Sequence, residues 1–129
     1  MKKTVLGVVL TACIFSMTAA AADLPSANEA AIRAALHSGK PTVADFGART
    51  CIPCKKMAPI LAELNRELKG KANILFTDVW AAPALAQSYR VQMIPTQIFF
   101  DAKGKEVKRH IGFMEQADII KELKTAGLK

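Results

Sequence analysis

Cysteine and histidine are scarce in this chain, which contains three cysteines and two histidines among 129 residues. Three cysteines are too few for the disulfide framework of a small secreted scaffold. A structural zinc site needs four ligands, and His37 and His110 stand singly without the spacing of metal ligands, so no metal site is expected. Basic residues outnumber acidic ones, for a net charge of +7, but they are scattered along the chain, which does not indicate nucleic-acid binding.

The chain also lacks internal repeats, low-complexity stretches and linkers. Its length suits one domain, and its 51% of hydrophobic residues is enough for a real core and argues against disorder.

Residues 1–22 have the three parts of a secretory signal peptide. Two lysines near the start precede the apolar stretch Val5–Met17, and the small residues Ala20–Ala22 precede a predicted mature start at Asp23. The domain proper then covers residues 23–129, with a net charge of +5 once the two leader lysines are left out.

Two other interpretations of the leader stay open. The uncharged stretch Thr4–Ala22 has 19 residues, which is just long enough for an uncleaved membrane anchor. Leu10–Cys13 resembles a bacterial lipoprotein signal, in which Cys13 would be lipidated. Under each interpretation the domain works outside the cytoplasm, where disulfides form and persist.

Hydrophobic periodicity and turn residues predict eight elements in the order αβαβαββα. Ser26 and Glu29 form a capping-box pattern at the start of the first helix. The order indicates a central mixed sheet of about four strands, including one antiparallel hairpin, with helices on both faces. The predicted helices are 26–37, 51–68, 83–89 and 116–123, and the predicted strands are 41–46, 72–79, 96–100 and 105–111.

The chemistry is expected at Cys51-Ile52-Pro53-Cys54. A disulfide between these cysteines closes a very small loop, so its effect on stability is only about 2 kcal/mol in the chain-entropy model. A cysteine pair this close is better explained as one that opens and closes. A structural disulfide or an inert reduced pair is the alternative. Covalent haem attachment needs histidine after the second cysteine, where Lys55 stands.

The position of the pair supports redox chemistry. Cys51 is predicted at a helix N-terminus, where backbone N–H groups and the positive end of the helix dipole favour the thiolate. Pro53 fits the first helical turn, because that turn has no use for its missing N–H.

Motifs along residues 40–128 resemble those of the thioredoxin family. The resemblance implies the thioredoxin fold and a thiol–disulfide oxidoreductase that needs no organic cofactor or metal, only its own redox-active disulfide. The motifs are Ala44-Asp45-Phe46, Cys51-Ile52-Pro53-Cys54-Lys55, Met57-Ala58-Pro59, Ile94-Pro95-Thr96, Gly104 and Gly112.

The resemblance also implies residue roles. Cys51 would attack the substrate disulfide, and Cys54 would resolve the mixed disulfide that results. Asp45 would be a buried carboxylate that relays protons to Cys54. Pro95 would be a cis-proline facing the active site, with the backbone of Ile94 pairing with the bound peptide.

Several positions depart from the family pattern, which puts redox potential and substrate choice in question. Thr50 replaces the usual tryptophan before the first cysteine, Gly47 replaces a second tryptophan, and Ile52-Pro53 replaces Gly-Pro. Thr50, Ile52 and Pro53 are expected at the substrate-binding surface. Phe76 stands where the family has a lysine near the buried acid. Trp80, the only tryptophan, is expected to be a packing or groove residue.

Asp45 is expected to have a raised pKa, because a strand covered on both faces removes water from its carboxylate. The alternative is a structural acid that bonds to backbone groups at the strand end.

The function indicated is reduction of protein disulfides outside the cytoplasm by a monomer. The family resemblance implies that its electrons come from a membrane thiol reductase of the DsbD or CcdA type. Its substrates would be periplasmic proteins, including apocytochromes c awaiting haem. A disulfide-forming oxidase and a non-enzymatic thioredoxin-fold binding module are the alternatives. The segment between Phe76 and Pro95 is too short for the helical insertion of DsbA-type oxidases.

Overall fold

A computed structural model describes residues 22–129, so residues 1–21 of the predicted leader, including Cys13, lie outside the described residues. The described residues form a four-stranded sheet in the order β2-β1-β3-β4. β1 runs parallel to β2 and antiparallel to β3, and β3 pairs antiparallel with β4. This confirms the predicted mixed sheet. The strands are β1 (Thr42–Gly47), β2 (Asn73–Asp78), β3 (Thr96–Phe100) and β4 (Glu106–Ile111).

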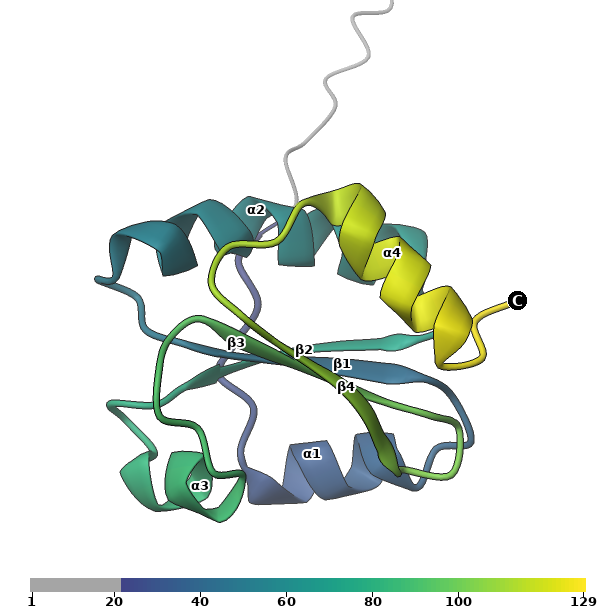
Figure 1. The fold of residues 1–129 in the computed structure, drawn as a ribbon, viewed down its shortest axis with the longest axis horizontal. Coiled ribbons are helices and arrows are strands. Elements are labelled where there is room, and N and C mark those ends of the chain that lie inside the picture. The colour runs from purple at the N-terminus through teal and green to yellow at the C-terminus, as the bar shows by residue number, and fades with distance from the viewer. Residues whose placement is uncertain (1–21) are drawn as a thin grey trace, which may run out of the picture.

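Helices cover both faces of the sheet, as predicted (Figure 1). α2 and α4 lie on one face, whereas α1 and α3 lie on the other. Among the described residues, no helix has the length and hydrophobicity that a membrane span requires. The helices are α1 (Glu29–Leu36), α2 (Ile52–Glu67), α3 (Pro83–Ser88) and α4 (Gln116–Thr125).

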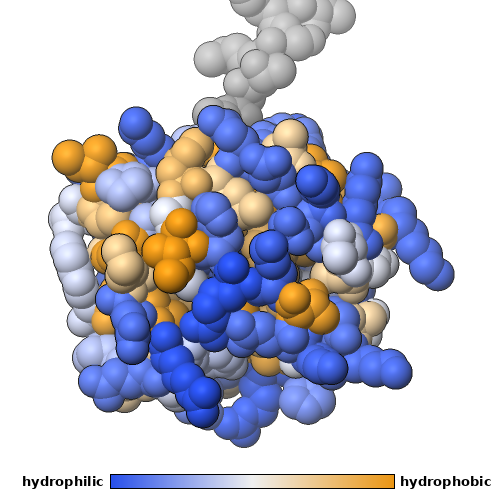
Figure 2. Space-filling model, viewed as in Figure 1, coloured by the Kyte–Doolittle hydropathy of each residue, from blue (hydrophilic) through white to orange (hydrophobic). Residues whose placement is uncertain are grey.

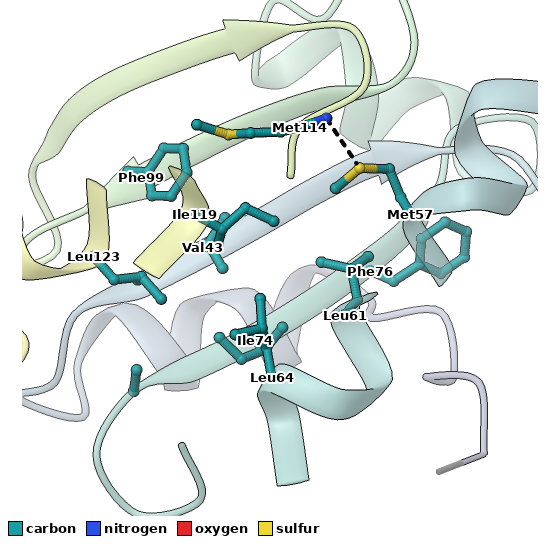
Figure 3. Packing of buried hydrophobic residues seen from close by; sticks show 11 residues of the cluster. Val43, Met57, Leu61, Leu64, Ile74, Phe76, Phe99, Met114, Ile119 and Leu123 are labelled. Carbon is teal, nitrogen blue, oxygen red and sulfur yellow. Dashed lines mark hydrogen bonds between the residues drawn. The ribbon is translucent and has the colours of Figure 1, made fainter. Parts of the chain in front are cut away.

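The two faces of the sheet bury separate hydrophobic clusters, because successive side chains of a strand point to opposite faces. Every residue of β1 and of β3 is buried, as befits the two central strands. The cluster beneath α2 and α4 is shown in Figure 3, where the Met114 N–H donates a hydrogen bond of 3.4 Å to Met57 Sδ. The cluster beneath α1 and α3 contains Ile32, Ala44, Phe46, Ile98 and Phe100.

The predicted start of the first helix is wrong. Asn28, not Ser26, is the N-cap, and its side chain accepts a hydrogen bond of 2.9 Å from the Ala31 N–H. Ser26 instead forms an isolated parallel bridge with Phe76, and its Oγ accepts from the Asp78 N–H at 2.9 Å. A long-range contact along β2 therefore outcompetes the local capping box.

Candidate active site

Four connecting segments meet at one end of the sheet. Phe46, near the end of β1, lies opposite Thr96 at the start of β3, and β4 ends opposite the same residue. Gly47 and Asp78 end β1 and β2 side by side. This end therefore carries the segments 48–51, 79–82, 94–95 and 112–113.

The cysteine pair sits in the first of these segments and at the start of α2. Cys51 and Cys54 are joined by a disulfide, with their Cα atoms 5.1 Å apart. Cys51 is the N-cap of α2, and its Sγ accepts a 3.3 Å hydrogen bond from the Cys54 N–H. Cys51 is half-buried, whereas Cys54 is only 4% exposed. An incoming substrate therefore meets Cys51 first.

The surroundings of Cys51 are exposed and partly apolar. Thr50 and Ile52 are exposed, with 73% of the Ile52 surface in solvent, and Pro53 is half-buried. The only tryptophan, Trp80, is 64% exposed in the segment after β2. Trp80 and Ile94 together line a hollow of about 260 Å³, so Trp80 is a groove residue rather than a packing residue.

The Ile94–Pro95 peptide bond is cis, as the motif predicts. Pro95 is buried and Ile94 half-buried at the start of β3. The Gly112 N–H donates to the Pro95 carbonyl at 2.8 Å, and the Thr96 hydroxyl donates to the Met93 carbonyl at 2.6 Å. These two bonds hold the segment at the same end of the sheet as Cys51.

Asp45 lies on β1, two residues before the strand ends, and its side chain is fully buried. Gln97 Nε2 donates a hydrogen bond of 2.7 Å to Asp45 Oδ1, whereas Oδ2 has no partner. Burial raises the pKa of the Asp45 carboxyl from 3.8 to about 7, and the bond from Gln97 opposes part of that rise. The predicted direction of the pKa change is confirmed. This carboxyl can therefore gain or lose a proton near neutral pH.

Asp45 and Cys54 border the same small space. A Cβ atom at Gly47 would lie 3.3 Å from each of three atoms: Asp45 Oδ2, Cys54 Cβ and Cys54 Sγ. Because Gly47 has no side chain, a gap remains at this position, and both Asp45 Oδ2 and Cys54 Sγ border it. A proton has a short way to travel between the two groups.

A second hollow, of about 310 Å³, lies beside Cys54 and is lined by Asp23, Arg49, Lys55 and Phe76, among others. The Arg49 guanidinium carbon lies 4.2 Å above the centre of the Phe76 ring, and Arg49 also donates to the Leu24 carbonyl. Phe76 is the register partner of Asp45 on β2. A ring with a cation stacked on it thus replaces the lysine expected near the acid.

Gln97 is the site residue that sequence reasoning missed. It was assigned only to a strand, and the signal that could have found it is a lone amide in the run Ile94–Phe100, where the neighbouring strand residues are apolar or hydroxyl-bearing. Among residues 22–129, no group of three or more His, Cys, Asp or Glu side chains could hold a metal ion.

Comparison with known proteins agrees with this geometry. The family model described as thioredoxin matches residues 24–125. The chain is 40% identical to a thioredoxin of Mycolicibacterium smegmatis over 93 residues, covering 70% of this chain and 82% of that protein. It is 38% identical over 88 residues to a bifunctional thioredoxin reductase/thioredoxin of Mycobacterium leprae, covering 68% of this chain but only 19% of that protein.

Solved structures show the same fold. A mutant thioredoxin from Halobacterium salinarum superposes with a TM-score of 0.71 at 24% identity, covering 80% of this chain and 88% of that one. Chloroplastic thioredoxin z gives a TM-score of 0.70 at 25% identity, covering 81% and 95%. With a matching family model over most of the chain and a disulfide at the start of α2, the chain belongs to the thioredoxin family, whose members are thiol–disulfide oxidoreductases that work through a redox-active disulfide.

Proposed function

We propose that this thioredoxin-family chain reduces protein disulfides outside the cytoplasm through Cys51 and Cys54. The observation that carries the proposal is the asymmetry of the pair. Cys51 is accessible at the start of α2, and Cys54 is shielded next to the buried carboxyl of Asp45. A disulfide that only stabilises the fold needs neither an accessible sulfur nor a neighbouring acid.

The reaction starts from the reduced pair. The Cys51 thiolate attacks one sulfur of the substrate disulfide, forming a Cys51–substrate bond and releasing the other substrate sulfur, which takes a proton. The Cys54 thiol then loses its proton, and its thiolate attacks Cys51 Sγ. The Cys51–Cys54 disulfide forms and the second substrate thiol leaves. Two electrons thus pass from the protein to the substrate.

Asp45 serves the second step. Its carboxylate accepts the proton of the Cys54 thiol across the gap at Gly47 and returns it to the departing substrate sulfur. A group with a pKa of about 7 can do both near neutral pH.

The substrate is an extended, cysteine-containing segment of a protein. Its backbone pairs with Ile94 ahead of Pro95, in the manner of a short added strand. Its side chains meet the exposed Thr50 and Ile52 and the half-buried Pro53 around Cys51. The apolar character of this surface favours apolar neighbours of the substrate cysteine.

The electron donor is proposed to be a membrane thiol reductase of the DsbD or CcdA type. Outside the cytoplasm a soluble cytosolic reductase is out of reach, which is why a membrane protein must carry the electrons. The substrates would be periplasmic proteins with oxidised cysteines, including apocytochromes c before haem attachment. The Mycobacterium leprae relative, named a bifunctional thioredoxin reductase/thioredoxin, carries a reductase and a thioredoxin in one chain.

The second candidate is a disulfide-forming oxidase, which the altered dipeptide Ile52-Pro53 and the missing tryptophan at Thr50 keep open. Against it, β2 and β3 are joined through α3, a helix of six residues, with no room for a large helical insertion. The reduction potential of the Cys51–Cys54 couple decides between the two. A strongly reducing value supports the reductase, and an oxidising value supports the oxidase.

The proposal is tested by trapping. Cys54→Ser should accumulate mixed disulfides with protein substrates, because nothing resolves the Cys51 bond. Cys51→Ser should trap none, and the double variant is the background. Equal trapping by Cys51→Ser would reverse the assigned roles. Wild-type protein that reduces no disulfide of insulin would instead favour a non-enzymatic binding module.

Localisation is tested by mass spectrometry of the native protein. A mature chain that begins at Asp23 supports secretion with cleavage. A diacylglycerol on Cys13 would make the protein a lipoprotein, and an intact Met1 in the membrane fraction would make residues 1–22 an anchor.

A further inference from the structure

Asp45 is paired with a buried amide. Asp45 and Gln97 are register partners across β1 and β3, so their side chains lie on the same face of the sheet. Val43 and Phe99, two residues away on the same strands, belong to the cluster beneath α2 and α4. The alternation of side chains therefore places Asp45 and Gln97 on the face from which Cys54 approaches.

Gln97 makes poor sense as a packing residue. Its side chain is fully buried, its Nε2 donates to Asp45 Oδ1 at 2.7 Å, and its Oε1 has no partner. A buried polar atom without a hydrogen bond is destabilising, whereas an apolar side chain of similar volume would have no such atom. The hydrogen bond to Asp45 is what the amide adds at this position.

That hydrogen bond also decides which carboxyl oxygen is free. With Oδ1 held by Gln97, Oδ2 is the oxygen that borders the gap at Gly47, where it faces Cys54. The Gln97 amide carries no charge, so it holds the Asp45 carboxyl without forming an ion pair. The ring of Phe76, which is the register partner of Asp45 on the other side, offers no hydrogen bond of this kind.

We propose that Gln97 is a positioning residue for disulfide exchange, holding the Asp45 carboxyl through Oδ1 so that Oδ2 exchanges a proton with Cys54. This proposal rests on the proposed function and specifies how its acid is held. The proton leaves the Cys54 thiol for Asp45 Oδ2 as the Cys54 thiolate attacks Cys51 Sγ, and it passes on to the departing substrate sulfur. Gln97 itself neither gains nor loses a proton.

Other titratable groups near this pair must be controlled. Cys54 faces Asp45 from α2, and Arg49 and Lys55 line the hollow beside Cys54. His110 of β4 is the register partner of Gln97, with Nε2 3.2 Å from the Phe113 carbonyl oxygen. Because this ionisable side chain is the direct register neighbour of Gln97, His110→Gln is a necessary control.

The test compares pH profiles for single-turnover reduction of insulin by reduced wild-type protein and by Gln97→Met, which keeps the volume and removes the amide. Without the Gln97 donor the Asp45 carboxylate is less stable, so the pKa of Asp45 should rise. The acid limb, which is the low-pH part of the profile where the rate increases with pH, should therefore move up by about one pH unit. At a fixed pH below this limb the rate should fall about tenfold. In an Asp45→Asn background the same substitution should cause no such displacement. Thr42→Val, which removes another buried polar side chain of β1, should leave the limb in place, as should His110→Gln.

A slower Gln97→Met protein with an unmoved acid limb would overturn the proposal, and so would an equal displacement in the Asp45→Asn background or a limb that moves with His110→Gln. Wild-type protein that reduces no insulin at all would instead contradict the proposed function.

A second measurement, which leaves Gln97 unchanged, covers the case in which Gln97→Met does not fold. In NMR spectra of wild-type protein, the Gln97 side-chain amide signals should titrate with the Asp45 carboxyl carbon, and they should be independent of pH in Asp45→Asn. Amide signals that ignore the Asp45 titration also overturn the proposal.

Discussion

At the scale of single residues, the acid on β1 couples stability to pH. The pKa of Asp45 is about 7 in the folded protein and 3.8 in a solvated chain. The folded protein therefore holds a proton that the unfolded chain releases, and stability falls as pH rises from about 4 to about 7. Above about pH 7 the free energy of unfolding falls no further on account of Asp45.

We predict that the oxidised wild-type protein loses up to about 4 kcal/mol of unfolding free energy over this window. Asp45→Asn should remove most of that dependence, because asparagine carries no proton to release. Urea unfolding of both proteins at pH 4, 5.5, 7 and 8 checks this. The variant should be the more stable protein at pH 8. Parallel curves for the two proteins across the window would show that Asp45 does not titrate there.

Gly47 is a second residue whose effect is testable. A methyl group at this position would press on Asp45 Oδ2 and on Cys54 at 3.3 Å, so these neighbours must move by a few tenths of an ångström. We predict that Gly47→Ala slows resolution of the mixed disulfide severalfold and leaves the attack by Cys51 nearly unchanged. Rapid quenching, with the mixed-disulfide fraction followed over time, separates the two steps. A variant with both steps slowed equally would place the effect outside the gap.

At the scale of secondary-structure elements, most boundaries could be predicted because the signals were local. The strand 96–100 was predicted with the bounds it has, and the helix 51–68 differs from α2 by one residue at each end. The bounds of α2 follow from local signals: Pro53 in the first turn and the regular spacing of apolar residues along the helix. Ser26 failed because its partner, Asp78, is 52 residues away.

The candidate site divides in the same way. Cys51, Cys54 and Asp45 stand in motifs that are visible along the chain. Gln97 could not be assigned a role, because its importance depends on the register between β1 and β3, which periodicity does not determine. The groove position of Trp80 likewise depends on the segment after β2 lying beside Ile94.

The segment after β2 should contribute to substrate binding. Asp78 Oδ1 accepts hydrogen bonds from the backbone N–H groups of Trp80 and Ala81 at 2.9 and 3.3 Å, which fixes the turn that presents the indole. We predict that Trp80→Ala raises KM for a protein disulfide about fivefold with little change in kcat, since partial burial of an aromatic ring is worth about 1 kcal/mol. Trp80→Phe is the control and should retain most of the affinity. A fall in kcat at constant KM would contradict a role in binding.

At the scale of the whole molecule, charged side chains mark one exposed edge of the sheet. Hydrophilic side chains cover most of the face seen in Figure 2, and the hydrophobic ones appear there as separate patches. The edge strand β4 is exposed along most of its length and carries Glu106, Lys108 and Arg109. Charged side chains on an edge strand hinder pairing with another sheet, which agrees with the expected monomer.

The opposite edge of the sheet, β2, is covered by the first described residues. The Ala27 N–H donates to the Phe76 carbonyl at 2.6 Å, the Thr77 hydroxyl donates to the Ala27 carbonyl at 3.2 Å, and Leu24 packs against the core. Together with the bonds made by Ser26 and by the Leu24 carbonyl, these contacts tie residues 24–27 to both β2 and the active-site loop.

Residues 24–27 therefore limit how far the N-terminus of the folded chain can be shortened. A chain that starts at Leu24 loses only the exposed Asp23 and should unfold like the chain that starts at Asp23. We predict that a chain that starts at Asn28 is less stable by about 4 kcal/mol, at roughly 1 kcal/mol for each of these hydrogen bonds lost, and aggregates through the uncovered edge of β2. Urea unfolding and light scattering of the two truncated proteins measure this. If the two are equally stable, residues 24–27 are dispensable. If the shorter chain is less stable, a protease that removes residues 23–27 would inactivate the protein by unfolding it, without any chemical change at Cys51 or Cys54.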